Sequence, residues 1–226
     1  MKISYVLPVH NGQNTISQCI RSILKQTVKP HELIIINDAS TDNTSRILDY
    51  YKSSKHEGII LVVITNEKRM GSARCRNIGN SLATGDVIKV CDVDIYNEKM
   101  GEAVEDFFEH NKDKSVFYTA LECRSSKHPM DMWGMDAFEW DFNSKCPISH
   151  PTVSYRKCVS DEIKYHEDST ETDLYEFFLI DAHKAGYLFG GCQDPLMIKI
   201  EGDTIRNRKK AQKIKAKKYK KYGIII

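Results

Sequence analysis

The fold of this chain is decided by the stretch Asp86-Val87-Ile88-Lys89-Val90-Cys91-Asp92-Val93-Asp94. Its first six residues form a short, mostly apolar run, which predicts a buried strand. Two carboxylates, separated by one apolar residue, follow where this strand should end. They indicate either an ordinary boundary between strand and loop, where Asp is common, or a cation site. Carboxylate oxygens favour hard divalent ions such as Mg²⁺ and Mn²⁺, and such an ion can hold a diphosphate.

The residues before this stretch alternate between apolar runs and helical patterns. We expect strands over residues 3–9, 33–36, 59–65 and 86–91, and helices over residues 15–26, 42–54 and 72–83. This order predicts a parallel sheet with helices on both faces. Ligands of such sheets bind beyond the carboxyl ends of the strands. Asn11, Asp38, Asp92 and Asp94 stand at such ends, so these residues should converge.

The second half of the chain is less regular. Its pattern predicts a helix over residues 100–110, a strand over 115–121, a loop-like segment over 123–142, a helix over 172–185 and a strand over 196–200. Neither an internal repeat nor a flexible linker separates the halves. We therefore expect a single domain over residues 1–205, followed by a basic segment over residues 206–226.

Composition is typical of a packed globular protein. The chain has 226 residues, of which 41% are hydrophobic. Its seven cysteines include no CxxC pair, and its first residues have no apolar signal-peptide region, so we expect a reducing, cytoplasmic setting. No apolar run approaches the ~18 residues of a membrane-spanning helix.

The basic segment concentrates the positive charge. Residues 206–221 include ten Lys or Arg and no acid, although the whole chain carries only +2. Such a segment indicates contact with anionic lipid headgroups, contact with nucleic acid, or a merely solvated helix. Nucleic-acid binding would not explain the first hundred residues, and we expect none. Peripheral contact with the cytoplasmic membrane face stays open.

Two further segments carry candidate binding residues. Asp38 ends a predicted strand, where its carboxylate can accept a hydrogen bond from a nucleobase N–H, although turn formation and helix capping explain the same residues. In residues 71–79, small side chains allow a close approach to a helix start. Arg74 and Arg76 place cations near the acids and near any bound phosphate. A solvated helix face is the alternative for one of these arginines.

Taken in order, five segments resemble the family 2 glycosyltransferases of the GT-A fold. They are residues 6–12, 37–44, 71–79, 83–86 and 92–94, which together cover roughly residues 1–100. The resemblance implies an α/β fold with a mostly parallel central sheet and helices on both faces. It also implies inverting, metal-dependent transfer of a sugar from a nucleotide diphosphate, most often a UDP-sugar, to a glycan hydroxyl. Residues 1–97 would then form the donor half and residues 98–205 the acceptor half.

The resemblance also implies roles for particular residues. Asp92 would contact the ribose or the donor sugar, and Asp94 would ligate Mn²⁺ or Mg²⁺ on the diphosphate. The chain departs from the family in having His10 where Tyr is frequent and Ile95 where a third Asp is frequent. The donor-binding residues expected from the resemblance are Pro8, Val9, His10, Asn11, Asp38, Arg76, Asp92, Val93 and Asp94.

The acceptor half matches the family more loosely. The family's Glu-Asp-x-x-Leu-Trp segment, which holds the catalytic base, corresponds best to residues 170–175, where Glu171 replaces the Asp. A carboxylate is needed there to take the proton of the acceptor hydroxyl. Asp173 and Asp168 are the alternative bases, and a helix N-terminal acid cluster is the non-catalytic interpretation. For acceptor binding we expect Trp133, Trp140 and His150, although core packing explains aromatic side chains equally well.

Two other functions fit parts of the pattern. A sugar-nucleotide nucleotidyltransferase can share this fold, but it needs a glycine-rich basic loop directly after the first strand, and residues 10–14 do not provide one. A binding module that keeps the nucleotide site without the catalytic base is the second alternative, because Glu171 stands where the family has Asp. Release of UDP, measured with and without Mn²⁺, separates an enzyme from such a module.

Overall fold

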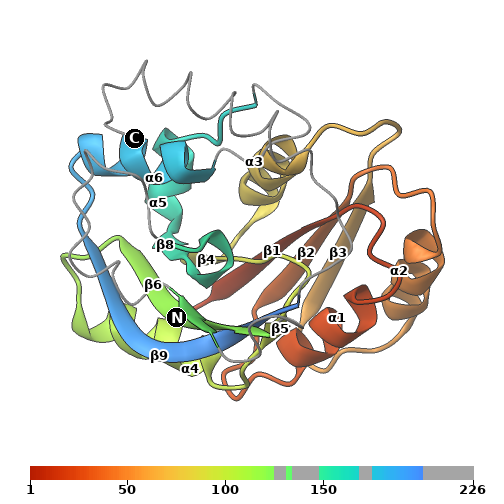
Figure 1. Ribbon diagram of the computed structural model, residues 1–226, viewed down its shortest axis with the longest axis horizontal. Helices are drawn as coiled ribbons and strands as arrows, with labels where there is room; N and C mark the ends of the chain where they lie inside the picture. The colour runs from red at the N-terminus through yellow and green to blue at the C-terminus, as the bar shows by residue number, and fades with distance from the viewer. Residues whose placement is uncertain (125–130, 134–147, 168–174, 201–226) are drawn as a thin grey trace.

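One curled sheet runs through both halves of the protein (Figure 1). The computed structural model describes residues 1–124, 131–133, 148–167 and 175–200. Within these ranges the sheet has nine strands in the order β3-β2-β1-β4-β8-β6-β9-β5, and β7 pairs with β6. The α/β architecture of GT-A type expected from the resemblance is therefore confirmed.

The first half of the sheet is parallel. β1 (Ile3–Val9) pairs with β2 (Glu32–Asn37) on one side and with β4 (Val87–Val90) on the other, and β3 (Ile60–Thr65) pairs with β2. β1, β2 and β4 are buried along their whole length. This burial on both faces explains why their sequences are nearly continuous apolar runs rather than alternating patterns.

Helices cover both faces of this half, as expected. On one face, α1 (Ile16–Leu24), α2 (Thr44–Ser53) and α4 (Met100–His110) pack against side chains such as Tyr5 and Leu7 of β1. On the other face, α3 (Ser72–Leu82), α5 (Lys157–Glu162) and α6 (Tyr175–Lys184) form a second core with Val6 and its neighbours. Side chains of successive β1 residues thus pack into different cores, because side chains alternate across a strand.

The second half joins the sheet through antiparallel pairs. β8 (Ser154–Arg156) lies antiparallel between β4 and β6 (Val116–Arg124), and directly follows the 3₁₀-helix η2 (His150–Thr152). The long β9 (Phe189–Ile200) runs parallel to β6 and antiparallel to β5 (Ile95–Tyr96). β7 (Asp131–Trp133) lies antiparallel to β6.

Some elements differ from the sequence-based expectations. β9 begins at Phe189 rather than at residue 196, because Gly190, Gly191 and Pro195 interrupt its apolar pattern. β5, β7, β8 and α5 were not expected, since each has only two to six residues. In addition, β5 and β8 pair with strands that are distant in the sequence. None of the helices that the structure describes is long and apolar enough to cross a membrane.

Candidate functional site

The carboxyl ends of β1, β2 and β4 lie at one edge of the sheet, and the segments that follow them meet there. The backbone N–H of Asp38 donates to the carbonyl of Val9 at 2.8 Å, and the N–H of Cys91 donates to the carbonyl of Val6 at 2.9 Å. A methyl group built on Gly12 would lie 3.8 Å from Cγ1 of Val93. The predicted convergence of the three strand ends is therefore confirmed.

The loop after β1 holds the turn after β2. His10 Nδ1 lies 2.7 Å from the carbonyl oxygen of Asp38, and this contact requires a proton on Nδ1 because a carbonyl can only accept. Asn11 has a φ of 52°, in the left-handed region that Asn tolerates. Its side-chain oxygen accepts from the N–H of Thr41 at 2.8 Å, and its own N–H donates to Ser40 Oγ at 3.0 Å. Pro8 and Val9 are buried in β1 beneath this loop.

Asp38 anchors the segment that leads into α3. Its side chain is only 4% exposed, and its carboxylate accepts from Asn66 Nδ2 at 2.9 Å, Met70 N at 2.7 Å and Gly71 N at 2.8 Å. Burial alone would raise the pKa of Asp38, but these hydrogen bonds, with a further one from the Cys75 thiol, hold it below its usual value. The carboxylate is therefore ionised and well occupied, and its contact with a nucleobase stays a prediction.

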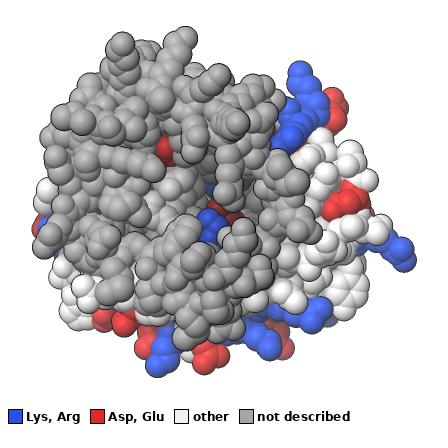
Figure 2. Space-filling view, in the orientation of Figure 1, with Lys and Arg blue, Asp and Glu red and all other residues white. Residues whose placement is uncertain are grey.

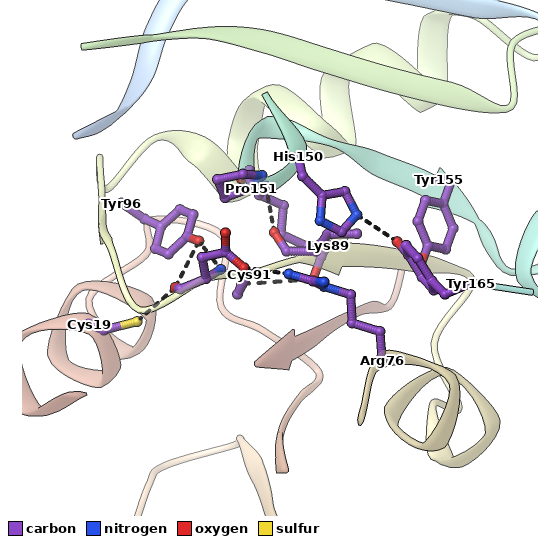
Figure 3. Close-up of polar contacts among 11 residues, drawn as sticks. Cys19, Arg76, Lys89, Cys91, Tyr96, His150, Pro151, Tyr155 and Tyr165 are labelled. Atoms are coloured by element: carbon purple, nitrogen blue, oxygen red, sulfur yellow. Dashed lines mark hydrogen bonds and ion pairs between the residues drawn. The ribbon is translucent and has the colours of Figure 1, made fainter. Parts of the chain in front are cut away.

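The acidic turn, residues 92–94, is paired with a buried arginine. Arg76 Nη2 of α3 lies 2.6 Å from Asp92 Oδ1, and the side chains are 2% and 37% exposed respectively. The Arg76 guanidinium carbon also lies 5.7 Å from the ring centre of Tyr165; both side chains are drawn in Figure 3. Arg76 thus links the acidic turn to the segment that precedes the expected acceptor helix. Asp94 is 4% exposed.

Two residues at this site were not singled out from the sequence. Lys89 is fully buried in β4, and its Nζ donates to the carbonyls of Pro151, Val90 and Val153 at 2.6, 3.0 and 3.3 Å. Burial lowers the pKa of Lys89 to about 8. Tyr96, in β5, contacts the backbone of the acidic turn, and burial raises the pKa of its hydroxyl well above the usual value. The sequence did contain a signal for Lys89, which is a lysine inside an apolar run. No sequence pattern pointed to Tyr96.

His150 lies within an aromatic cluster rather than at the surface. It is 1% exposed, its Nε2 lies 2.9 Å from the hydroxyl of Tyr165, and its ring stacks on Tyr175 at 4.6 Å between ring centres. The hydroxyls of Tyr165 and Tyr155 are 3.2 Å apart, and this chain of contacts is visible in Figure 3. Direct contact with an acceptor would require the cluster to open, so the acceptor role of His150 stays a prediction.

The remaining expected residues fall largely outside the described residues. Glu171, Asp173, Asp168 and Trp140 all do, as does the basic segment; for Trp133 the structure gives only its backbone place in β7, opposite Leu121. The two flanks of residues 168–174 are nevertheless placed.

One of the two flanks lies directly beside Arg76. Asn77, the residue next to it in α3, donates to Glu167 Oε1 at 2.8 Å and to the carbonyl of Tyr165 at 2.9 Å. On the other flank, Tyr175 opens α6 and stacks on His150.

The acidic turn has the donor chemistry of a divalent-ion site. Asp92 and Asp94 offer hard carboxylate oxygens, which suit Mg²⁺ and Mn²⁺. Among the described residues there is no group of three or more His, Cys, Asp or Glu that could hold a metal. The turn thus offers carboxylate oxygens that such an ion accepts, and the role of Asp94 as its ligand stays a prediction.

Charges on the visible described surface are mixed. In Figure 2, acidic and basic side chains are interspersed along the lower and right-hand margins of the molecule, and no broad patch of one sign is seen among the coloured residues.

A family model described as "Glycosyl transferase family 2" matches residues 4–145, which is more than half of the chain. The chain belongs to this family. Glycosyltransferase GlyG of Streptococcus pneumoniae is 25% identical to it over 199 residues, covering 79% of this chain and 65% of GlyG. An uncharacterised glycosyltransferase of Bacillus subtilis, YwdF, is 30% identical over 176 residues, covering 74% of this chain and 62% of YwdF. The family 2 chain thus spans less than two thirds of the length of these relatives.

Solved structures share the fold. S. aureus TarS (residues 1–349) in complex with UDP-GlcNAc has a TM-score of 0.70 at 19% identity, over 90% of the family 2 chain and 60% of that TarS fragment. Glucosyl-3-phosphoglycerate synthase of Mycobacterium tuberculosis, in complex with Mn²⁺, UDP and phosphoglyceric acid, has a TM-score of 0.71 at 15% identity, over 100% of this chain and 80% of that one. At such identities the likeness concerns the fold.

Proposed function

We propose that this chain transfers a sugar from a nucleotide-diphosphate donor, with a UDP-sugar as the favoured class, to a hydroxyl of a glycan or glycoconjugate. The observation that carries the proposal is the meeting of three strand ends at one edge, where a buried arginine pairs with the acidic turn. Family membership supports glycosyl transfer. The donor class is supported by neighbours solved with UDP-GlcNAc and with GDP-Man and Mn²⁺.

We assign the donor half to residues 1–97. His10 and Asn11 would line the base and ribose side together with Asp38, and Asp92 would contact the ribose or donor sugar. Asp94 would hold Mn²⁺ or Mg²⁺, which when bound neutralises the negative charge of the leaving diphosphate. Arg76 pairs with Asp92 at 2.6 Å. Its guanidinium would also place a fixed positive charge beside the leaving diphosphate.

The acceptor half, residues 98–205, would supply the base. Glu171 would take the proton from the acceptor hydroxyl as that oxygen attacks the anomeric carbon, and the single displacement inverts this centre. Asp173 and Asp168 are the alternative bases. The placed flanks support this assignment, because Glu167 accepts from Asn77, the neighbour of Arg76, and Tyr175 stacks on His150, which contacts Tyr165 beside Arg76. Trp133 and Trp140 are the proposed acceptor contacts.

We also propose that the basic segment contacts anionic lipid headgroups. Ten Lys or Arg within residues 206–221 would each gain about 1 kcal/mol near such a surface. Co-sedimentation with anionic vesicles, compared between the full chain and a chain that ends at residue 205, measures this contact. Equal binding of the two chains would contradict it.

The decisive test of the function is an assay of UDP release from UDP-sugars, with and without Mn²⁺, on the wild-type chain and Asp94→Asn. We expect the substitution to lower turnover by on the order of 100-fold or more, because it removes a charge that faces the leaving group. Asp113→Asn is the matched control, since that side chain is 64% exposed and pairs with the adjacent Lys114.

The outcomes separate the candidates. Wild-type turnover in Asp94→Asn would remove Asp94 from the ion site. UDP binding without hydrolysis or transfer to any acceptor would favour a nucleotide-sugar-binding module. Binding restricted to GDP- or TDP-sugars would overturn the UDP assignment.

A further inference from the structure

The hydroxyl of Tyr96 contacts the acidic turn through its backbone. It accepts a hydrogen bond from the N–H of Asp92 at 2.9 Å and donates one to the carbonyl oxygen of the same residue at 3.1 Å. The side chain is buried, with 3% exposed, and Figure 3 shows its hydroxyl directed at the strand end. One side-chain atom therefore touches both peptide groups that flank Asp92.

We propose that Tyr96 is a positioning residue for the ion site, because its hydroxyl fixes the backbone from which Asp92 and Asp94 project. This inference rests on the proposed function. Tyr96 itself need not touch donor or ion; it acts through the conformation of the acidic turn.

The bonding pattern explains why a hydroxyl is required. The backbone torsions of Asp92 set the relative orientation of its two flanking peptide groups, and a group bonded to both restricts that orientation. The same Asp92 carbonyl accepts from the N–H of Asp94 at 2.8 Å, so the position of Asp94 depends on it as well. Phenylalanine could fill the same volume but could make neither hydrogen bond.

Tyr96 is itself held from several sides. Its N–H donates to Ser22 Oγ of α1 at 3.1 Å, and Ser22 Oγ donates in turn to the carbonyl of Cys19 at 2.7 Å. Tyr96 also pairs with Met197 of β9, and Lys89 Nζ lies 5.4 Å from the centre of its ring. The hydroxyl is thus presented to the acidic turn from a frame made of α1, β9 and β4.

The competing explanation is that Tyr96 merely fills the core, where it packs with Met100 and Val104. A core ring would tolerate replacement by phenylalanine with an effect on stability alone. A positioning residue predicts a second effect, on the binding of the ion with its nucleotide, because groups that orient metal ligands tune affinity by about 10–100-fold.

The test compares Tyr96→Phe with the wild-type chain and with Tyr51→Phe. Tyr51, in α2 and away from the acidic turn, is a matched control. It is 6% exposed, and its hydroxyl donates to the carbonyl of Ser17 at 3.2 Å. UDP binding is followed by calorimetry over a range of Mn²⁺ concentrations, and the melting temperature is measured without metal. We expect Tyr96→Phe to need about 10-fold more Mn²⁺ for half-maximal binding, and Tyr51→Phe to keep the wild-type requirement.

The inference is overturned if Tyr96→Phe binds UDP with the wild-type Mn²⁺ requirement, or if Tyr51→Phe shifts it equally. If Tyr96→Phe does not fold, Ser22→Ala decides, because it keeps the hydroxyl but loosens its frame; a wild-type Mn²⁺ requirement there counts against the inference. A wild-type chain whose UDP binding is insensitive to Mn²⁺ overturns the proposed function and this inference together. Mn²⁺-dependent binding that Tyr96→Phe leaves intact overturns the inference alone.

Discussion

At the scale of single residues, the site is organised by ionised side chains that have hydrogen-bond or ion-pair partners within the chain. Asp38 receives three hydrogen bonds of 2.7–2.9 Å from Asn66, Met70 and Gly71. Arg76, whose side chain is only 2% exposed, donates to the Asp92 carboxylate at 2.6 Å. Each charge is buried at a cost that its partners offset, so removal of one partner should be felt in stability as well as in binding.

Replacement of Asp38 by Asn tests whether the charge of this carboxylate contributes to stability. The amide nitrogen would face an N–H donor, so we expect a loss of about 1–3 kcal/mol in the free energy of unfolding at pH 7. The pKa of Asp38 is lowered in the folded state, so the carboxylate stabilises fully above its ordinary value of 3.8. That contribution is lost as the pH falls through the folded-state pKa.

Urea unfolding of the wild-type chain and Asp38→Asn at pH 7 and below pH 4 measures both effects. The difference between the two proteins should shrink at the lower pH. Asp113→Asn, at an exposed position, should match the wild type at both. A difference that stays constant with pH would show that the charge of Asp38 is not what stabilises the 66–71 segment.

At the scale of elements, α3 links the acidic turn to the second half of the chain. It presents Arg76 to the acidic turn and Asn77 to the 165–167 segment. It can do so because it lies close against β1: a methyl group built on Gly79 would be 2.4 Å from Cγ1 of Val6. The absent side chain at position 79 therefore sets the distance between helix and sheet.

Gly79→Ala should push α3 away from β1. Alanine normally stabilises a helix relative to glycine by roughly 0.5–1 kcal/mol, but the contact with Val6 should reverse the sign and cost about 1–3 kcal/mol. Ser81→Ala, on the exposed side of the same helix, is the control. Denaturant unfolding measures both, and an unchanged or raised stability of Gly79→Ala would contradict the close packing.

At the scale of the whole molecule, one sheet unites the first half of the chain with the second half. β8 lies between β4, which leads to the acidic turn, and β6 of the second half. Lys89 adds a second link, because its ammonium joins β4 to the backbone around η2. We therefore expect that a substitution in the second half can abolish transfer without changing nucleotide binding by the first half, although both halves share one sheet.

Glu171→Gln tests that separation. If Glu171 is the base, the variant should bind UDP with wild-type affinity and wild-type Mn²⁺ dependence, but transfer should fall by on the order of 100-fold or more. Asp173→Asn and Asp168→Asn are the matched comparisons. The same loss in either of these, with full activity in Glu171→Gln, would move the assignment to that residue.

The parts predicted from sequence were those set by local pattern. The four strands of the parallel half, their helices and the meeting of Asn11, Asp38 and the acidic turn follow from periodicity and from the rule for parallel sheets. The roles of Tyr96 and Lys89 did not follow, because they depend on partners such as Ser22 and Pro151, which lie 74 and 62 residues away. β8 was missed for the same reason, because it pairs with β4 and β6, whereas α5 has only six residues.

The buried cations beside the acidic turn have a consequence for the order of binding. Arg76 and Lys89 carry two positive charges near the two negative charges of Asp92 and Asp94, and a pKa of about 8 keeps Lys89 mainly protonated at pH 7. The local formal charge is therefore balanced before any ligand arrives. A divalent cation alone gains little attraction from such a site, whereas a cation together with a diphosphate preserves the balance. Nucleotide and ion should accordingly enter as a pair.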